Sequence, residues 1–420
     1  MESKSNILIL TNHFYPEEFR VNDIAFELAK RNYAITVITA IPDYPIGKFF
    51  SGYSLIKRRR ERIGDVRIIR LPIIPRGSGR KLQLSLNYLS YLISSLFLVA
   101  FHALDNDYDA VMVHMTSPFF ITFPAVYLKR IKKMPLILWV LDLWPESVEA
   151  AGGIKDKNIL GLLNVIVKKV YQQCNTILVS SNSFKKSISQ KGNFEKKLVY
   201  FPNWADSIPA IDIDKQYKNI SPFSNKSSSD FIFLFAGNLG EAQNIDFILD
   251  SISKMDLKKG VKFVFLGDGR KRAQLIKKSN SLGLSEICYF PGRFPQTMMP
   301  YFMGHAEVML ASLKSDAIFS LTVPAKVQFY MAQGKPILAI LNGEGAEIIN
   351  RARCGIATKP DDIQGFQNAL SLFLGYTKEE LYQMGENGKK YYLGQFDKEK
   401  RLDQIDGLLR KFTNNNRDIR

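Results

Sequence analysis

The stretch TVPAKVQFYMAQGKPILAI, Thr322–Ile340, is the most informative feature of the sequence. A polar loop ends at Pro324, a helix is predicted to follow it, and a Gly-Lys-Pro turn then leads into an apolar strand. Lys326 falls at the start of the predicted helix, where free backbone N–H groups and the positive end of the helix dipole attract anions. The stretch therefore predicts an anion-binding helix in an α/β domain.

A second loop of the phosphate-binding type, FLGDGRKR, lies upstream at Phe265–Arg272. The glycine turn of this loop is followed directly by the cations Arg270, Lys271 and Arg272. Another glycine-containing loop, FAGNLGEAQN at Phe235–Asn244, could equally be a structural turn. Two such elements in the C-terminal half indicate a diphosphate-linked ligand such as a nucleotide sugar. The candidate ligand-binding residues in these loops are Gly237, Asn238, Gly240, Gly267, Asp268, Gly269 and Arg270.

The two halves of the chain each alternate apolar strands with amphipathic helices, which is typical of parallel sheets covered by helices. The fold class we predict is α/β, with two doubly wound domains facing a cleft. We expect the domains to span residues 1–205 and 206–396, and the helix within 397–420 to pack back on the first domain. The strands we expect are 6–11, 34–40, 109–114, 135–141, 176–180 and 198–201, then 231–236, 261–266, 287–290, 308–311 and 336–340.

The composition is basic, with a net charge of +17, which calls for an acidic partner or reflects a solvated basic surface. The three cysteines form no CxxC pair and there are four histidines, so we expect no metal site. The N-terminus leads directly into a strand without a signal peptide, so we expect a cytoplasmic protein.

The segment from Leu82 to Leu104 is the most apolar part of the chain, and two basic clusters precede it. Its length is nearly enough to span a bilayer, but serines, an asparagine and a glutamine interrupt it. Three interpretations remain open: a buried helix of the domain, a helix lying on a membrane surface, or a true span. The basic clusters favour contact with anionic lipid, so we expect a peripheral protein on the inner face of the cytoplasmic membrane.

Polar residues also follow the predicted strands of the first domain, where ligands of such sheets bind. His114 ends one strand and is a candidate base or orienting group, or else a hydrogen-bonded structural histidine. Asp142 and Glu146 lie in the loop after another strand and are candidates for orienting a hydroxyl. The candidates for binding a second substrate are Arg20, Asn22, Asp23, Asp43 and Tyr44.

Taken together, these loops resemble glycosyltransferase family 4, which has the two-domain, Rossmann-like GT-B fold, over nearly the whole chain. The pieces that carry the resemblance are NHFYPEEFRVND, IPDYP, DLWPES, FPNWAD, AGNLGEAQN, FLGDG and VPAKVQFYMAQGKPIL. The DLWPES and PAKVQ pieces are similar to transferases of O-antigen, capsule and colanic acid, including transferases of N-acetyl-L-fucosamine.

The resemblance implies a retaining, metal-independent transfer from a UDP-sugar bound by the second domain, with no cofactor. The acceptor on the first domain would be a lipid-diphosphate-linked saccharide. His114 matches the active-site histidine of the family and Lys326 the basic residue near the donor phosphates. Arg293 and Phe294 match the stretch that lines the base, and Ser320 and Thr322 complete the donor set beside Lys326.

The sequence also departs from the family at three places. FRVND replaces the glycine pair of the first loop, and Asn238 and Gln243 stand where the family has Arg and Lys. Leu321 and Phe329 replace the usual pair of glutamates. We expect Asp316 to substitute in part as the group that holds the donor sugar.

Three other functions remain open at this point. A nucleotide-sugar epimerase shares the two-domain fold but needs no acceptor. A nucleic-acid-binding protein would explain the charge, although the basic runs lack interleaved aromatic residues. A membrane scaffold would leave the loops at the strand ends unexplained.

Overall fold

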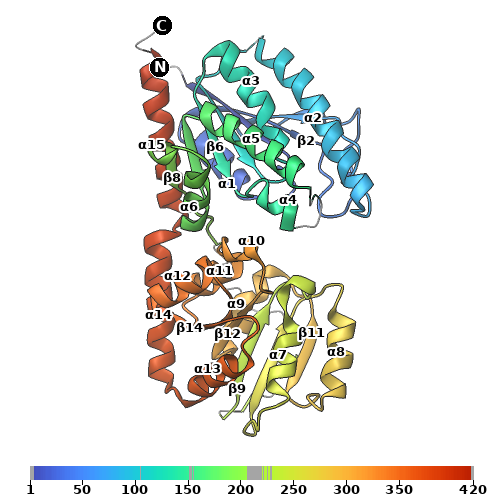
Figure 1. Cartoon of the computed structure of the whole chain (residues 1–420), viewed down its shortest axis with the longest axis vertical. Helices are drawn as coiled ribbons and strands as arrows, with labels where there is room; N and C mark the ends of the chain where they lie inside the picture. Colours follow the sequence, from blue (N-terminus) through green and yellow to red (C-terminus); the bar gives the residue numbers. More distant parts are fainter. Residues whose placement is uncertain are drawn as a thin grey trace. The chain divides into compact units, whose positions relative to one another are not determined.

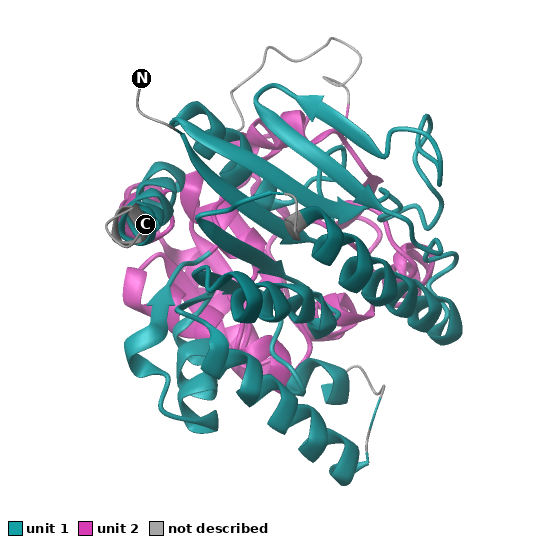
Figure 2. Cartoon of the chain, turned by 90° about the horizontal axis from the view of Figure 1, so that it is seen from above, with its two compact units in different colours: residues 1–202, 398–420 teal, residues 203–397 magenta. Residues whose placement is uncertain are grey.

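The computed structural model describes residues 4–104, 106–150, 154, 156–205, 220, 222–224, 226–227 and 229–417. It divides into two compact units, which Figure 2 colours separately. Unit 1 comprises Met1–Pro202 with Lys398–Arg420, and unit 2 comprises Asn203–Asp397. The stretch 212–230, whose many serines, asparagines and lysines predict an exposed loop, lies mostly outside the described residues.

Unit 1 is built on an eight-stranded sheet with the order β3-β4-β2-β1-β5-β6-β7-β8. All neighbouring pairs are parallel except β3 and β4, which form an antiparallel hairpin. The central strands are continuous apolar runs because helices cover both of their faces. Their bounds are β1 Ser5–Thr11, β2 Tyr33–Ala40, β3 Arg60–Ile63, β4 Val66–Leu71, β5 Ala110–Met115, β6 Leu136–Val140, β7 Thr176–Val179 and β8 Leu198–Tyr200.

The helices of unit 1 form a layer on each face of this sheet (Figure 1). Along the sheet, the connection from β1 to β2 runs in one direction, and the connections from β4 to β5 and from β5 to β6 run in the other. Because such connections are right-handed, α1 lies on one face of the sheet and α2 and α3 lie on the other. The helix bounds are α1 Arg20–Lys30, α2 Lys81–Leu104, α3 Thr122–Lys132, α4 Glu146–Ala150, α5 Lys157–Gln173, α6 Asn182–Lys191 and α15 Lys398–Arg417, with 3-10 turns η1 Phe119–Ile121 and η2 Glu195–Lys197.

The last helix, α15, packs on α1 within unit 1. Arg31 at the end of α1 binds Asp403 at 2.6 Å, and the Tyr33 hydroxyl donates to Asp406 at 2.6 Å. Leu402, Ile405 and Leu409 are buried. The same helix is therefore joined to unit 1 by an apolar face and by ion pairs.

Helix α2 has an unusual distribution of side chains. The residues that face the domain include Asn87, Tyr91 and Ser95, and the side chains of Asn87 and Tyr91 bond to backbone carbonyls of unit 1. Its exposed face is apolar, formed by Leu82, Leu86, Leu89, Ile93, Leu96, Phe97, Leu98 and Phe101.

Among the described residues, Lys81–His102 is the one helical segment long and apolar enough to span a membrane by length and composition. Only 22% of its apolar window is buried. The interpretation of this segment as a buried helix is therefore wrong for most of its length.

Unit 2 contains a six-stranded parallel sheet with the order β11-β10-β9-β12-β13-β14. Its core is rich in phenylalanine; the rings of Phe233 and Phe263 stack with centroids 5.1 Å apart. The strand bounds are β9 Phe231–Ala236, β10 Val261–Leu266, β11 Cys288–Gly292, β12 Val308–Ser312, β13 Ile337–Ile340 and β14 Gly355–Thr358.

The helices of unit 2 connect these strands and, with the sheet, enclose the core (Figure 1). Helix α11 corresponds to the helix predicted after Pro324. The bounds are α7 Ile245–Ile252, α8 Arg272–Ser281, α9 Met299–His305, α10 Ala317–Ser320, α11 Ala325–Ala332, α12 Glu344–Ala352, α13 Ile363–Gly375 and α14 Lys378–Gln395, with 3-10 turns η4 Glu241–Gln243 and η5 Gln296–Met298.

Candidate functional site

The two glycine loops of unit 2 lie side by side at the carboxyl ends of β9 and β10. The Leu239 amide donates to the Asp268 carbonyl at 2.9 Å, and the Gly267 amide donates to Gly292 at 2.8 Å. Gly267 has φ +138°, and a Cβ on it would lie 1.8 Å from the Gly237 carbonyl oxygen. Only glycine fits at this position, so the backbone of both loops is left open to a ligand.

These loops form one wall of a pocket of about 700 Å³. Arg293 and Phe294 also line this pocket, and their contact with a nucleotide base stays a prediction. Arg270 is exposed and does not line the pocket, and the neighbouring Lys271 is paired with Asp246. The pocket is lined by Ala236, Gly237, Asn238, Leu266, Gly267, Asp268, Gly269, Arg293, Phe294, Gln296, Met299 and Phe329.

Lys326 lies beside this pocket in the first turn of α11. Its ammonium is 3.6 Å from the centroid of the Phe235 ring, and a Cβ on Gly237 would lie 3.5 Å from it. Among the described residues, no hydrogen-bond partner satisfies this buried nitrogen. Burial lowers the pKa of Lys326 to about 7. An anion at the glycine loops would supply the missing partner and favour the charged form.

Tyr330 fixes α11 to the end of β9. Its hydroxyl accepts a hydrogen bond from the Ala236 amide at 3.1 Å, and burial raises its pKa. Two residues earlier, the Gln328 side chain donates to the Asn203 carbonyl at 2.8 Å. The contact of Tyr330 holds α11, and with it Lys326, against the end of β9, where the first glycine loop begins.

The other predicted donor residues near α11 are engaged in local turns. Asp316 caps α10 by accepting from the Ile318 amide at 2.9 Å. The Ser320 hydroxyl donates to Ala317 at 2.6 Å, and the Thr322 hydroxyl donates to Phe319 at 3.0 Å. Gly240 lies just outside the lining of the pocket. Contact of these residues with a donor stays a prediction.

In unit 1, His114 lies at the carboxyl end of β5, opposite Thr11 of β1. It is 1% exposed, and burial together with nearby His13 lowers its pKa to about 3, so the ring is neutral. The Thr11 hydroxyl is 3.0 Å from Nδ1 of His114 and donates its proton to the His13 carbonyl. His114 Nδ1 must therefore be the donor to Thr11, which leaves Nε2 as an acceptor.

The predicted carboxylates after β6 are held by neighbouring side chains. Asp142 accepts from the hydroxyls of Ser117 and Ser147. Glu146 pairs with Lys191 at 2.6 Å. These contacts shape the loop, and no hydrogen bond joins either carboxylate to His114 among the described residues.

The residues predicted to bind the acceptor fall into two groups. Asp23 faces Lys398 at 2.9 Å and Arg20 at 3.8 Å, so it anchors α15, while Asn22 bonds to the Glu17 carbonyl at 2.6 Å and shapes its loop. Asp43 is buried at the end of β2, and next to it the Tyr44 ring is 42% exposed.

Glu17 and His13, which the sequence did not single out, organise the loop around Asp43. One oxygen of Glu17 accepts from the amides of Asp43 and Tyr44 at 2.9 and 2.7 Å, and the other lies 2.9 Å from His13 Nδ1. By distance, His13, Glu17 and Asp43 could face one cation. However, these hydrogen bonds, and one from the Arg76 amide to Asp43, already occupy their ligand atoms. We interpret the cluster as a hydrogen-bonded support for the loop.

Replacing Glu17 by alanine should destabilise unit 1 by roughly 2–4 kcal/mol, because two buried amides and a histidine lose their partner together. Chemical denaturation measures this change. Replacement of exposed Glu18 by alanine is the matched control and should have little effect. Equal stability of the two variants would contradict the supporting role of Glu17.

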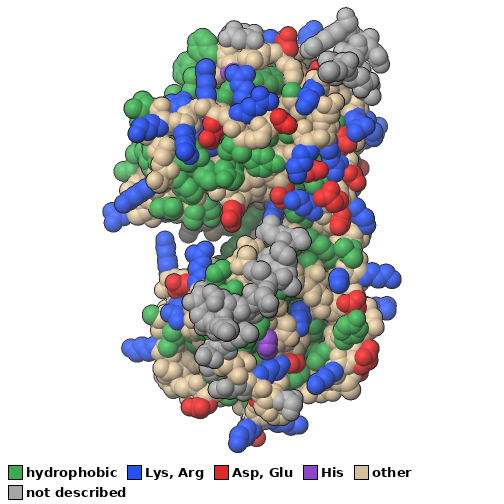
Figure 3. Space-filling view, turned by 180° about the vertical axis from the view of Figure 1, so that it is seen from behind, with side chains coloured by type: hydrophobic (Ala, Val, Ile, Leu, Met, Phe, Trp, Pro, Cys, Tyr) green, Lys and Arg blue, Asp and Glu red, His purple; other side chains and the backbone are tan. Residues whose placement is uncertain are grey.

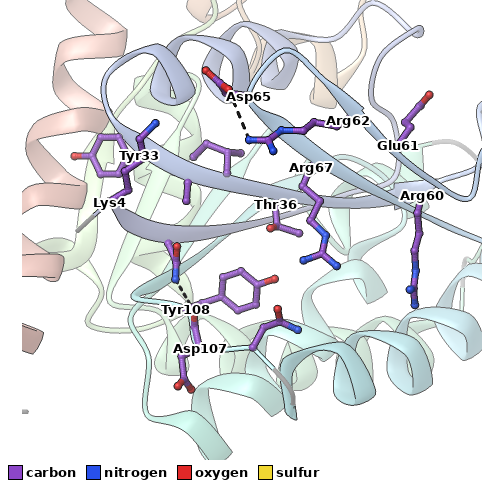
Figure 4. Close-up of a pocket in the computed structure, with 14 residues that line it drawn as sticks. Lys4, Tyr33, Thr36, Arg60, Glu61, Arg62, Asp65, Arg67, Asp107 and Tyr108 are labelled. Carbon is purple, nitrogen blue, oxygen red and sulfur yellow. Dashed lines mark hydrogen bonds and ion pairs between the residues drawn. The ribbon is translucent and has the colours of Figure 1, made fainter. Parts of the chain in front are cut away.

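A second pocket in unit 1, of about 740 Å³, lies at the amino ends of the strands (Figure 4). Arg60, Arg67 and Tyr108 are among its lining residues, and Figure 4 shows Arg67 reaching toward Tyr108. None of the residues predicted to act in the reaction lines it. Since ligands of parallel sheets bind at the carboxyl ends of strands, this pocket is not the candidate site.

Two family models match the chain, one for each half. A model for "Glycosyl transferase 4-like domain" matches residues 18–204, and one for "Glycosyl transferases group 1" matches residues 216–391.

Two curated relatives are similar over part of their length. WbjE of Pseudomonas aeruginosa, named as a probable glycosyltransferase, is 29% identical over 60% of this chain. WcaI of Escherichia coli K12, named as a colanic acid biosynthesis glycosyl transferase, is 24% identical over 63% of this chain. The matches span 63% and 65% of those proteins.

Solved structures share the fold across the whole chain. Sucrose-phosphate synthase of Thermosynechococcus elongatus superposes with a TM-score of 0.72 at 13% identity, covering 97% of this chain and 99% of that one. Trehalose-phosphate synthase of Burkholderia vietnamiensis gives 0.71 at 13% identity, covering 97% of each chain. Anabaena HepE, solved with UDP and glucose, gives 0.66 at 15% identity, covering 97% and 100%. The fold is therefore GT-B.

Proposed function

We propose that the chain transfers a sugar from a UDP-sugar to a lipid-diphosphate-linked saccharide with retention of configuration. The matches of its two halves to models of group 1 and family 4-like glycosyltransferases support this proposal. The sugar we propose is an N-acetylhexosamine such as N-acetyl-L-fucosamine, and the product is a bacterial surface polysaccharide. The similarity to WbjE and WcaI supports this setting.

The observation that carries the proposal is the buried ammonium of Lys326 beside two glycine loops, which has no hydrogen-bond partner among the described residues. A charged group without a partner costs free energy in the folded protein, and a diphosphate at the loops removes that cost. Arg293, which lines the pocket, adds a second positive charge. The uridine would lie against Phe294.

The mechanism we propose is substitution on one face of the donor sugar. The bond from C1 to the β-phosphate oxygen breaks while the acceptor oxygen bonds to C1, and the acceptor proton passes to the departing β-phosphate. Lys326 and the amides of the first turn of α11 stabilise the negative charge that develops on this phosphate. His114, neutral and with Nε2 as an acceptor, orients a sugar hydroxyl rather than acting as a nucleophile.

The experiment that tests the function measures nucleotide release from UDP- and GDP-sugars, with and without lipid-diphosphate N-acetylhexosamine, in EDTA. We expect one UDP-sugar to give release that depends on the acceptor and persists in EDTA. Interconversion of a donor without release would instead favour an epimerase. Dependence on added divalent cations would contradict metal-independent transfer.

We further propose that unit 1 binds the cytoplasmic face of an anionic membrane through α2. Most of the exposed side chains of this helix are apolar, whereas Asn87 and Ser95 are buried against the protein, which is the reverse of a soluble surface helix. Its neighbour α3 adds the exposed side chains of Tyr127 and Ile131. On the side of unit 1 seen in Figure 3, hydrophobic side chains lie among lysines and arginines.

Replacing Leu89, Phe97 and Phe101 together by serine should weaken binding to phosphatidylglycerol vesicles at least about tenfold, because each buried apolar side chain contributes roughly 1.5–3 kcal/mol. The thermal stability should change little, since Phe97 and Phe101 are 63% and 65% exposed. Vesicle co-sedimentation measures binding. Leu372→Ser in unit 2, where the side chain is 55% exposed, is the matched control. Equal binding of both variants would contradict the proposal.

A further inference from the structure

Arg76 lies between β4 and α2, and its guanidinium is held by aromatic rings rather than by a carboxylate. It stands 5.3 Å from the centroid of the Tyr44 ring and 5.9 Å from that of Tyr88. Its Nη1 is 3.4 Å from His13 Nε2. Among the described residues, no ion pair engages this guanidinium. The carboxylate of Asp43 accepts a hydrogen bond from the backbone amide of Arg76 at 2.7 Å and not from its side chain.

Arg76 lies between His13, which follows β1 at the carboxyl end of the sheet, and Tyr88 of the apolar helix α2. His13 stacks on Phe19 with ring centroids 4.8 Å apart, and Phe19 contacts the His114 ring edge-on at 6.2 Å. On its other side the chain continues within five residues into α2, whose exposed face is apolar. A ligand at Arg76 would thus have the candidate histidine on one side and an apolar surface on the other.

We propose that the Arg76 guanidinium binds the diphosphate of the acceptor, with its sugar directed toward His114 and its lipid along α2. This inference rests on the proposed function and identifies Arg76 as the residue that selects the acceptor. Aromatic rings stacked on a guanidinium leave its N–H edge available, and that edge matches phosphate oxygens bidentately. Glu17 and Asp43 do not compete for the cation, because backbone amides and His13 engage them.

The test uses two acceptors that carry the same N-acetylglucosamine. One is linked through diphosphate to a short alkyl chain, and the other is a phenyl glycoside without phosphate. Arg76→Ala should raise KM for the diphosphate acceptor roughly 10- to 100-fold, as expected for loss of charged hydrogen bonds, and leave kcat/KM for the phenyl glycoside unchanged. The backbone bond to Asp43 persists in this variant. Arg67→Ala, which removes the same charge at the opposite end of the sheet, should change neither value.

A binding measurement keeps the inference separate from the proposed function. Calorimetry with the same alkyl-diphosphate compound, with the donor site saturated by UDP, requires no transfer. We expect Kd to weaken at least about tenfold in Arg76→Ala. An unchanged Kd would overturn the inference, and so would an equal loss with both acceptors. Weaker binding to phosphatidylglycerol vesicles with an unchanged Kd for the diphosphate would assign Arg76 to a lipid headgroup instead.

Discussion

Lys326→Met should lose transfer by about 100-fold or more and yet give a more stable protein. The loss follows because one preorganised group at a developing charge contributes on the order of 10²–10³ in rate. The gain follows because the wild-type fold buries an ammonium that finds no hydrogen-bond partner in the described part of the chain. Initial rates of nucleotide release and thermal denaturation measure the two effects.

The stability gain should depend on pH in a defined direction. Between pH 7 and the ordinary pKa of 10.5, the unfolded chain keeps a proton that folded Lys326 has released. The stability of the wild type therefore rises with pH across this window. The free energy of unfolding of Lys326→Met exceeds that of the wild type by the largest amount at pH 7 and below. At about 1.4 kcal/mol per pKa unit, the advantage is on the order of a few kcal/mol.

Lys271→Met is the matched control in the same unit. Lys271 is paired with Asp246 and Glu241, and its hydrogen bond to Asp246 raises its pKa. This variant should lose stability slightly and keep its transfer rate. Near-normal turnover by Lys326→Met would contradict the assignment of Lys326 to the phosphate.

His114→Ala should lower the rate of transfer by about 100-fold while UDP binds as in the wild type, since a misplaced substrate costs rate rather than donor affinity. With a pKa of about 3, the ring does not titrate between pH 5 and 9, so the rate profile should show no step from His114 there. Initial rates and UDP titrations measure these outcomes.

Thr11→Val tests whether the tautomer of His114 matters. It removes the acceptor of Nδ1–H, 3.0 Å away, without removing the ring. We expect a smaller loss of rate, about tenfold, and the same UDP affinity. Unchanged initial rates in both variants would make His114 a structural residue.

The strands that pattern alone could predict are those buried on both faces, such as β1 and β9, because continuous apolar runs have few other interpretations. β3 was missed because three of the four residues of RERI are charged and the strand lies at the edge of the sheet, where apolar side chains are not required. Its antiparallel partner β4, VRIIRL, was missed although most of its side chains are buried. β14 was missed because GIAT is short and only half-buried.

Local backbone features of the candidate site could be predicted, whereas contacts between distant side chains could not. Gly267 lies in a turn and Lys326 at a helix start, as predicted, because both features have local sequence signatures. The partnership of Asp23 with Lys398 spans 375 residues, and the convergence of Glu17 and Arg76 on Asp43 depends on strand order. The sequence carries no local signal for either.

Calorimetric titration of UDP into the wild type and Lys326→Met at pH 7.0 and 8.5 determines whether Lys326 holds the diphosphate of the donor. If Lys326 must be charged to hold the diphosphate, binding takes up a proton above its pKa of about 7. The wild-type affinity should then fall about tenfold between the two pH values, while the variant binds weakly and without this dependence. Equal affinities of the two proteins at both pH values would contradict a donor site built around Lys326.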